Sequence, residues 1–102
     1  MDSEISVIIP VYNESSTISG CLHTLLKQSL PPKEIILIDD GSTDDTLRKI
    51  KIKQKSTKKI KILTQDHQGP AIARNLGAKQ AKGKILAFVD GDMEFEPFFL
   101  EN

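Results

Sequence analysis

Two carboxylates on one short turn, Asp90 and Asp92, are the residues whose type and spacing point most directly to chemistry. They follow the apolar residues 85–89, a run typical of a buried strand that ends in a tight loop. Carboxylates this close repel each other unless a cation lies between them, and such hard oxygen ligands suit Mg²⁺ or Mn²⁺. The pair therefore indicates a metal-assisted site for a phosphate or nucleotide-sugar ligand. The alternative is an ordinary acidic turn.

An alternating series of strands and helices would position this turn. The β-branched and apolar runs predict strands at Ile5–Val11, Glu34–Asp39, 59–64 and 85–89. Apolar spacing predicts a first helix from residue 18 that ends before Pro31. A third helix is predicted at 71–81, with Pro70 at its first position and Gly83 as its C-terminal cap.

The second helix is the least secure element. Ser42, Thr43 or Asp44 can cap it, and Leu47 and Ile50 would share one of its faces. Ile50 and Ile52 also alternate with lysines, however, which fits a strand equally well. We expect a helix, because the order of the flanking elements favours one.

This order predicts an α/β fold, a Rossmann-like, doubly wound and mostly parallel four-stranded sheet with helices on both faces. In such sheets ligands bind at the carboxyl ends of the strands. Three polar clusters follow predicted strand ends, namely Tyr12-Asn13-Glu14, Asp39-Asp40-Gly41-Ser42 and Asp90-Gly91-Asp92. We therefore expect one site at this rim, built from all three.

The composition limits the number of domains and the classes of partner that the chain can have. The 102 residues allow a single domain, and 14 basic against 14 acidic residues give no sign of a nucleic-acid partner. Eight of the basic residues lie between Arg48 and Lys61, which fits either a polyanion or membrane contact or a solvated face. The single Cys21 excludes an internal disulfide, and no apolar run approaches the ~20 residues of a membrane span. We expect a cytoplasmic protein, at most peripheral at the cytoplasmic face of a membrane.

With these motifs placed, the chain resembles the amino-terminal half of a family 2 glycosyltransferase, a group with the GT-A fold. The resemblance covers about nine-tenths of the chain. It is carried, in order, by Val7-Ile-Ile-Pro-Val-Tyr-Asn-Glu14, Ile38-Asp-Asp-Gly-Ser-Thr-Asp44, Gly69-Pro-Ala-Ile-Ala-Arg-Asn-Leu-Gly77 and Phe88-Val-Asp-Gly-Asp92.

The resemblance implies a partial GT-A fold with strand order 3-2-1-4 and a nucleotide-diphosphate-sugar donor, expected to be a UDP-sugar, held with Mn²⁺ or Mg²⁺. Transfer would invert the anomeric carbon of the sugar. The implied site residues are Val11 and Tyr12 against the base, Glu14 at the nucleoside, Asp39 at the imide hydrogen of a uracil-type base, Arg74 at a carbonyl or phosphate, Asp90 near the ribose and metal, and Asp92 on the metal. His67 stands where the family often has Asn, so it either touches the donor or is inert.

Two departures limit the expected activity. Met93 stands where the family often has a third acid, and no residue here can be assigned as the general base that an acceptor hydroxyl requires. We expect residues 1–102 to be one donor-binding domain, truncated at its carboxyl end and inactive in transfer by itself. The acceptor, whether saccharide, lipid phosphate or protein, stays open.

Two further expectations concern partners. The alternative function is a non-catalytic nucleotide-binding or interaction module that needs a partner chain. The strand at 85–89 would lie at a sheet edge, followed by the apolar tail that includes Phe95, Phe98, Phe99 and Leu100. An apolar edge is a template for pairing with another chain, so we expect a homodimer, or a complex with a missing carboxyl half, through this edge and tail.

Overall fold

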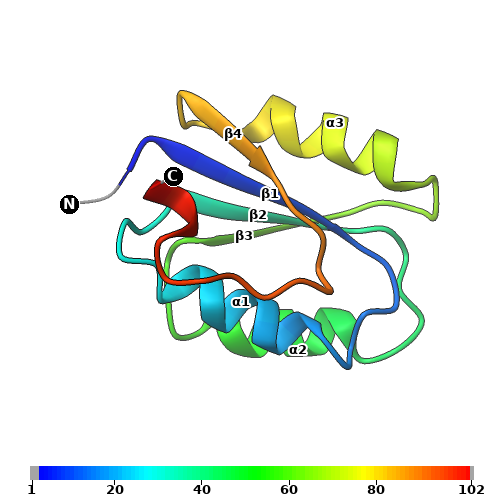
Figure 1. The fold of residues 1–102 in the computed structure, drawn as a ribbon. Helices are drawn as coiled ribbons and strands as arrows, with labels where there is room; N and C mark the ends of the chain where they lie inside the picture. Colours follow the sequence, from blue (N-terminus) through cyan, green and yellow to red (C-terminus); the bar gives the residue numbers. More distant parts are fainter. Residues whose placement is uncertain (1–2, 102) are drawn as a thin grey trace.

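A four-stranded parallel sheet with helices on both faces makes up the computed structural model, which describes residues 3–101 (Figure 1). In chain order the elements are β1 (Ile5–Val11), α1 (Ile18–Leu26), β2 (Glu34–Asp39), α2 (Thr46–Gln54), β3 (Ile60–Thr64), α3 (Pro70–Gln80), β4 (Ile85–Phe88) and a 3₁₀ turn at Phe99–Glu101. The predicted alternation of strands and helices is therefore confirmed.

The strands lie in the order β3-β2-β1-β4, as predicted, and every neighbouring pair is parallel. Val11 of β1 is level with Asp39 of β2, which is level with Thr64 of β3. Strand β4 ends earlier, because Phe88 is level with Ile8. The loop after β4 consequently begins beside the last residues of β1, and the four carboxyl ends form one rim.

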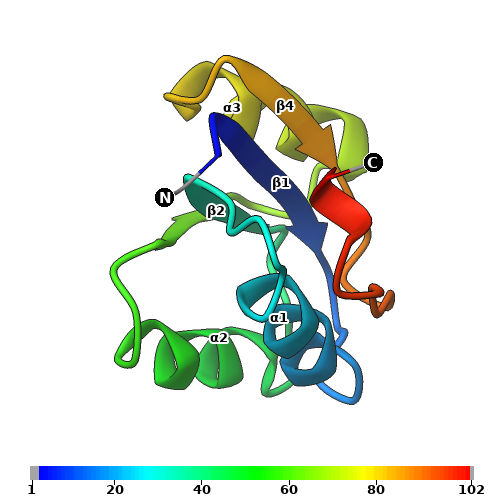
Figure 2. The same ribbon diagram turned by 60° about the vertical axis from the view of Figure 1, so that its left-hand side comes forward.

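Helices α1 and α2 cover one face of the sheet and α3 covers the other (Figures 1 and 2). Alternate strand residues point to opposite faces, so the sheet separates two cores. The larger core contains Val7, Ile9 and Leu37 with residues of α1 and α2. The smaller consists of the buried residues Ile8, Ile36, Ile38 and Ala73. The continuous apolar strands β1 and β2 are thus buried on both sides, which is why they show no polar alternation in the sequence. The equally apolar β4 was expected to be buried as well, and that prediction was wrong, because β4 is at the edge of the sheet and most of its side chains are exposed.

The element predicted least securely is a helix. Ile50 of α2 is fully buried, whereas Ile52 is 54% exposed, so the alternation with lysines does not mark two faces of a strand. The prediction of the cap was wrong, because the N-cap residue is Asp45, which makes no side-chain cap hydrogen bond. Asp44, one residue earlier, still supports the start of the helix, since its Oδ1 accepts a hydrogen bond from the Thr46 N–H at 2.9 Å.

The prediction for Gly83 was wrong. Helix α3 ends at Gln80, and Ala81 is already extended, so Gly83 lies beyond the cap. Its N–H donates to Ser6 Oγ at 2.8 Å, and a Cβ at this position would overlap the backbone oxygen of Glu4. A glycine is needed here because the chain passes close against β1 before β4 begins.

The edge strand β4 is open on its outer side, where Ile85 is 57% and Phe88 49% exposed. The apolar tail that follows is only partly exposed, because Phe95 and Leu100 pack against the larger core while Phe98 stays 58% exposed. A dimer or complex through this edge stays a prediction. Within residues 3–101, no helix has the length and apolar character that crossing a membrane requires.

Candidate functional site

A cleft of about 330 Å³ opens at the carboxyl ends of β1 and β4, beside the first turns of α3. This volume is at the small end of the range for small-molecule sites. The cleft contains every residue expected at the site except Asp39. Its lining residues are Pro10, Val11, Tyr12, Glu14, Asp40, His67, Pro70, Arg74, Asp90 and Asp92.

The loop after β1, which carries Tyr12 and Glu14, is tied to the loop after β2. Asn13 has a left-handed backbone, with φ of 51°, a conformation that Asn tolerates better than most residues. Its Oδ1 accepts from the Thr43 N–H at 2.8 Å, and the Glu14 N–H donates to Thr46 Oγ1 at 2.8 Å. The polar residues that follow β2 therefore hold the first loop in place.

Glu14 reaches back under the loop that follows β4. Its Oε2 is buried and has no hydrogen-bond partner among residues 3–101. A Cβ at Gly91 would overlap this oxygen, so the glycine lets the Glu14 carboxylate approach the loop closely. Burial, followed by the nearby charge of Asp92, raises the pKa of Glu14. The cleft thus contains a carboxylate that lacks a counter-charge.

The structure does not bring Asp39 to the cleft. Asp39 has the same strand parity as Leu37, so its side chain shares the face covered by α1 and α2, where it is 4% exposed. Its Oδ1 is buried without a hydrogen-bond partner among the described residues. The next residue, Asp40, has the opposite parity and lines the cleft. Of the two acids that end β2, Asp40 is therefore the one that lines the cleft.

Asp40 is buried and fully hydrogen-bonded by the loop before α3. Its Oδ1 accepts from Gln65 Nε2 at 2.8 Å and from the Gln68 N–H at 2.7 Å, and its Oδ2 accepts from the Gly69 N–H at 3.1 Å. Burial by itself would raise the pKa of Asp40, but these hydrogen bonds, together with His67, lower it below its ordinary value. Asp40 is thus an ionised side chain that holds the loop before α3 in place and so shapes one wall of the cleft.

Two rings form the exposed part of this wall. Tyr12, 40% exposed, lies against His67 with ring centroids 4.1 Å apart and planes tilted by 32°. His67 Nδ1 is 3.0 Å from Asp40 Oδ2 and 3.2 Å from the Asp40 carbonyl oxygen. Both of these partners are acceptors, so Nδ1 carries the hydrogen and Nε2 is left free on the exposed side of the ring. Of the two roles considered for His67, this placement favours a ligand contact.

The opposite wall carries the two acids of the β4 loop. Asp90 is 3.8 Å from Arg74 of α3, and the Asp90 side chain is 62% exposed. Asp92 is exposed, and no hydrogen bond or ion pair links it to another described residue. The loop is supported from below, where buried Cys21 Sγ lies 3.7 Å from the Asp90 carbonyl oxygen. Burial raises the pKa of Cys21 to about 12, so the sulfur is a protonated donor.

The acids at this rim fit a cation that a ligand helps to hold. No group of three His, Cys, Asp or Glu side chains among the described residues is gathered as a ready metal site. Asp90, Asp92 and the unpartnered Glu14 oxygen are nevertheless hard oxygen donors, and Mg²⁺ is commonly bound through one or two carboxylates together with substrate phosphates. The donor set therefore suits a cation shared with a phosphate-bearing ligand.

Comparison with known proteins identifies the family. The family model for glycosyl transferase family 2 matches residues 6–102. The chain belongs to this family. It is 38% identical over 99 residues to YibD, an uncharacterized glycosyltransferase of Escherichia coli K12, covering 97% of this chain and 29% of that protein. It is 47% identical over 91 residues to an uncharacterized glycosyltransferase of Rickettsia conorii, covering 89% of this chain and 15% of that protein. The chain thus spans less than a third of the length of these family 2 relatives.

Solved structures confirm the predicted fold. Staphylococcus aureus TarS, residues 1–349 in complex with UDP, is 36% identical with a TM-score of 0.85 over 99% of this chain and 30% of that chain. The mannosyltransferase PcManGT of Pyrobaculum calidifontis, in complex with GDP-Man and Mn²⁺, is 25% identical with a TM-score of 0.84 over 93% of this chain and 29% of that chain. The partial GT-A fold with strand order 3-2-1-4 is therefore the fold of this family 2 chain.

The sequence did not indicate the roles of two residues at the rim. Asp40 was placed in one of the three rim clusters but was given no individual role, although the period of two that buries Ile36 and Ile38 against α3 predicts residue 40 on that same side. Cys21 lies in the core, and its contact with the Asp90 carbonyl joins residues 69 positions apart. No local pattern in the sequence could have indicated that contact.

Proposed function

We propose that this chain is the donor-binding part of a glycosyltransferase and that it binds UDP, or a UDP-sugar, together with Mn²⁺ or Mg²⁺. One observation carries the proposal: the cleft has a wall of two rings at one side and two exposed carboxylates at the other, of which one is only loosely paired with Arg74. A nucleoside diphosphate has the matching order of groups, a flat base followed by a chain of anionic phosphates.

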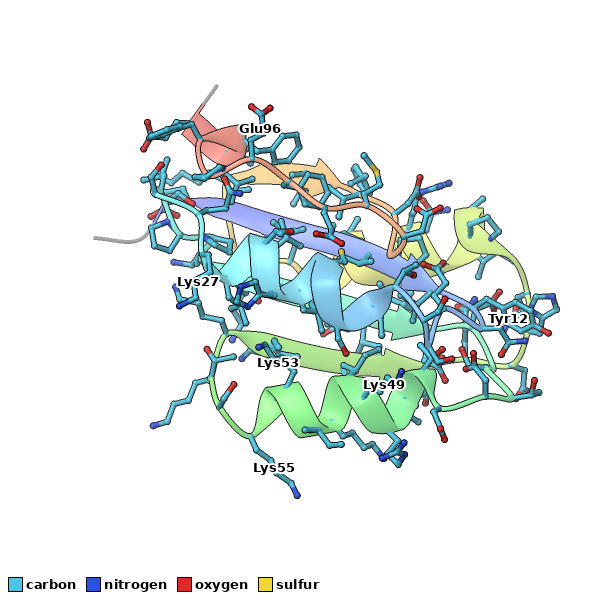
Figure 3. The ribbon with its side chains drawn as sticks, turned by 60° about the horizontal axis from the view of Figure 1, so that its bottom comes forward. Tyr12, Lys27, Lys49, Lys53, Lys55 and Glu96 are labelled. Carbon is cyan, nitrogen blue, oxygen red and sulfur yellow. The ribbon has the colours of Figure 1, made fainter. Side chains whose placement is uncertain are left out.

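The ring wall is suited to a nucleobase. Stacking on an aromatic side chain stabilises a base without needing a particular hydrogen-bond pattern. Figure 3 shows Tyr12 at the rim, away from the body of the sheet. The Asp40 hydrogen bonds keep the loop that carries His67 in place before any ligand arrives, so little ordering is needed on binding. We assign the base to Tyr12, His67 and the backbone of Val11, and the nucleoside to Glu14.

The acidic wall is suited to the diphosphate and its cation. A bound divalent cation supplies charge neutralisation as the nucleoside diphosphate leaves. Asp92 and Asp90 would hold that cation, and Arg74 offers a planar fork of donors to a phosphate oxygen. The Arg74–Asp90 pair is exposed and 3.8 Å apart, so it is weak and can exchange partners when a phosphate enters.

The reaction proposed for the whole enzyme is a direct displacement that inverts the anomeric carbon. This chain would contribute the part that binds and orients the donor. Among the described residues of the cleft none is placed to accept the proton of an acceptor hydroxyl, because Asp40 is saturated by hydrogen bonds and the remaining acids are assigned to nucleoside and cation. The names of the solved relatives, with UDP-GlcNAc and with GDP-Man and Mn²⁺, support a nucleotide-sugar donor.

Titration calorimetry of this chain with UDP and with GDP, each in Mn²⁺ and in EDTA, tests the proposal. We expect UDP to bind in Mn²⁺, to lose most of its affinity in EDTA, and to bind more tightly than GDP. Equal affinity for UDP in EDTA would refute the metal, and tighter binding of GDP would refute the assigned base.

Glu4→Gln is the matched control, because Glu4 is an exposed acid at the opposite end of the sheet whose contact with Lys33 is a 3.8 Å surface pair. Its titration curves should match those of the unchanged chain. If neither nucleotide binds while the circular dichroism spectrum shows a folded α/β domain, the nucleotide-binding function itself is wrong.

A further inference from the structure

The solvent-facing side of α2 carries an exposed isoleucine among cations. Thr46 and Ile50 are fully buried, so at 100° per residue positions 48, 52 and 55 point away from the sheet. Ile52 is 54% exposed there, at the centre of a shallow groove. We call this surface the α2 crest, and its residues are Leu47, Arg48, Lys51, Ile52 and Lys55.

Basic and acidic residues are distributed unevenly between the region around α2 and the rest of the chain. The stretch from Arg48 to Lys61 holds eight of the 14 basic residues and no acid, which leaves six basic residues against 14 acids elsewhere. A neutral chain therefore has one strongly basic part, centred on α2, and an otherwise acidic remainder. Such a division attracts anionic surfaces to one side of the molecule and repels them from the other.

The cations of the crest are available to a partner. Lys49 is turned toward the protein, where its Nζ donates to the Ser15 carbonyl oxygen at 2.6 Å. Arg48 forms an exposed pair with Asp45 at 3.1 Å. Lys51 and Lys55 make no ion pair with another described residue, and Figure 3 shows Lys55 extending away from α2. The two lysines of the crest, Lys51 and Lys55, are therefore exposed and have no ion-pair partner among the described residues.

We propose that the α2 crest binds the surface of an anionic phospholipid bilayer. Lysines around an apolar side chain match the two parts of a membrane interface, anionic headgroups above and acyl chains below. A nucleic acid fits less well, because single-stranded and loop binding usually relies on aromatic stacking and the crest has no aromatic side chain, with no Phe, Tyr or Trp between Asn13 and Ala87. With one isoleucine, the binding is peripheral and depends on salt.

This contact does not compete with the cleft. The crest lies on the outer side of α2, whereas the cleft is lined by residues of α3 and of the β4 loop, and α3 covers the opposite face of the sheet (Figures 1 and 2). A bilayer against the crest leaves the cleft open. Lipid binding and nucleotide binding can therefore be measured and can fail separately.

Sedimentation with vesicles tests the proposal, using phosphatidylcholine alone and phosphatidylcholine mixed equally with phosphatidylglycerol. We expect the chain to bind only the mixed vesicles and to be released by salt. Each lysine near an anionic surface contributes about five-fold to the affinity. The double variant Lys51→Gln/Lys55→Gln should therefore bind the mixed vesicles about 25-fold more weakly. Ile52→Ser should weaken binding at constant charge.

Lys79→Gln/Lys84→Gln is the matched control, since it removes two exposed lysines away from α2. This variant should bind the mixed vesicles almost as well as the unchanged chain, and all variants should keep their affinity for UDP. The proposal would be overturned if the control variant lost as much vesicle affinity as Lys51→Gln/Lys55→Gln. It would also be overturned if the chain bound phosphatidylcholine vesicles equally well, or bound no vesicles at all. Preferential binding of an RNA oligonucleotide over the mixed vesicles would do the same.

Discussion

The two acidic turns at the carboxyl rim, after β2 and after β4, use the same residue types in opposite surroundings. Asp40 is 3% exposed, and its carboxylate accepts three hydrogen bonds from residues 65–69 in addition to the contact with His67. The Asp90 side chain is 62% exposed, with Arg74 3.8 Å away. Composition alone does not distinguish the two turns.

The difference indicates which acid builds the site and which is left for a ligand. A buried carboxylate that accepts from backbone N–H groups cannot release them without losing its own hydrogen bonds, so Asp40 is fixed. The acids after β4 lie close enough to Glu14 that their charges add to the effect of burial in raising the pKa of Glu14, and Arg74 is the only cation paired with them among the described residues. A group of acids with so little cationic compensation is a region kept for binding.

Replacing Asp92 should have the largest effect on binding. Asp92→Asn removes a proposed cation ligand and leaves the fold unchanged, because the side chain is exposed and has no partner among the described residues. We expect about a 100-fold loss of UDP affinity in Mn²⁺, at the upper end of what changes around a metal site cost. Calorimetry in Mn²⁺ and EDTA measures it. If the variant binds as tightly as the unchanged chain, the acids after β4 do not hold the cation.

Replacing Asp40 should act on stability first. Asp40→Ala leaves the N–H groups of Gln68 and Gly69 without their acceptor, so we expect a loss of about 1–3 kcal/mol in the free energy of unfolding. Urea unfolding measures this change, and proton exchange at the two amides locates it. UDP affinity should also fall, because His67 loses its anchor. Unchanged stability would show that the loop before α3 is held by other contacts.

The sequence predicted the sheet but not which way each acid faces. Strand runs such as Ile5–Val11 and the order of elements were sufficient for the parallel, doubly wound class, because crossover connections allow few arrangements, whereas the strand order 3-2-1-4 came from the family resemblance. The role of Asp39 came from the family resemblance alone, and the structure places its neighbour Asp40 at the cleft. Strand parity could have separated the two acids, whereas the Cys21–Asp90 contact depends on how α1 packs beneath β4, which no local pattern encodes.

Replacing Asp44, another acid near the rim, should change the stability by a smaller amount that depends on pH. The hydrogen bond from the Thr46 side chain, followed by the Thr46 backbone N–H, lowers the pKa of Asp44 from 3.8 to about 2. A lowered pKa adds stability that is fully present above pH 3.8 and is lost as the pH falls through about 2. Asp44→Ala should therefore be less stable than the unchanged chain at neutral pH, and the difference should shrink below pH 3.8 and disappear only below about pH 2. Urea unfolding across this range checks it, and a difference independent of pH would contradict it.

The smallest effect is expected at Asp39, and it decides between the two acids of the β2 turn. Asp39 is 4% exposed on the face of α1 and α2, and its Oδ1 has no donor among the described residues. Asp39→Asn keeps the shape and removes a buried charge, so stability should be unchanged or higher. Because the side chain does not line the cleft, UDP affinity should stay within about two-fold, which is under 0.5 kcal/mol. A ten-fold loss of affinity at unchanged stability would instead mean that ligand binding turns Asp39 toward the base, as the family resemblance implied. In that case the buried oxygen without a partner would be the one that a nucleotide satisfies.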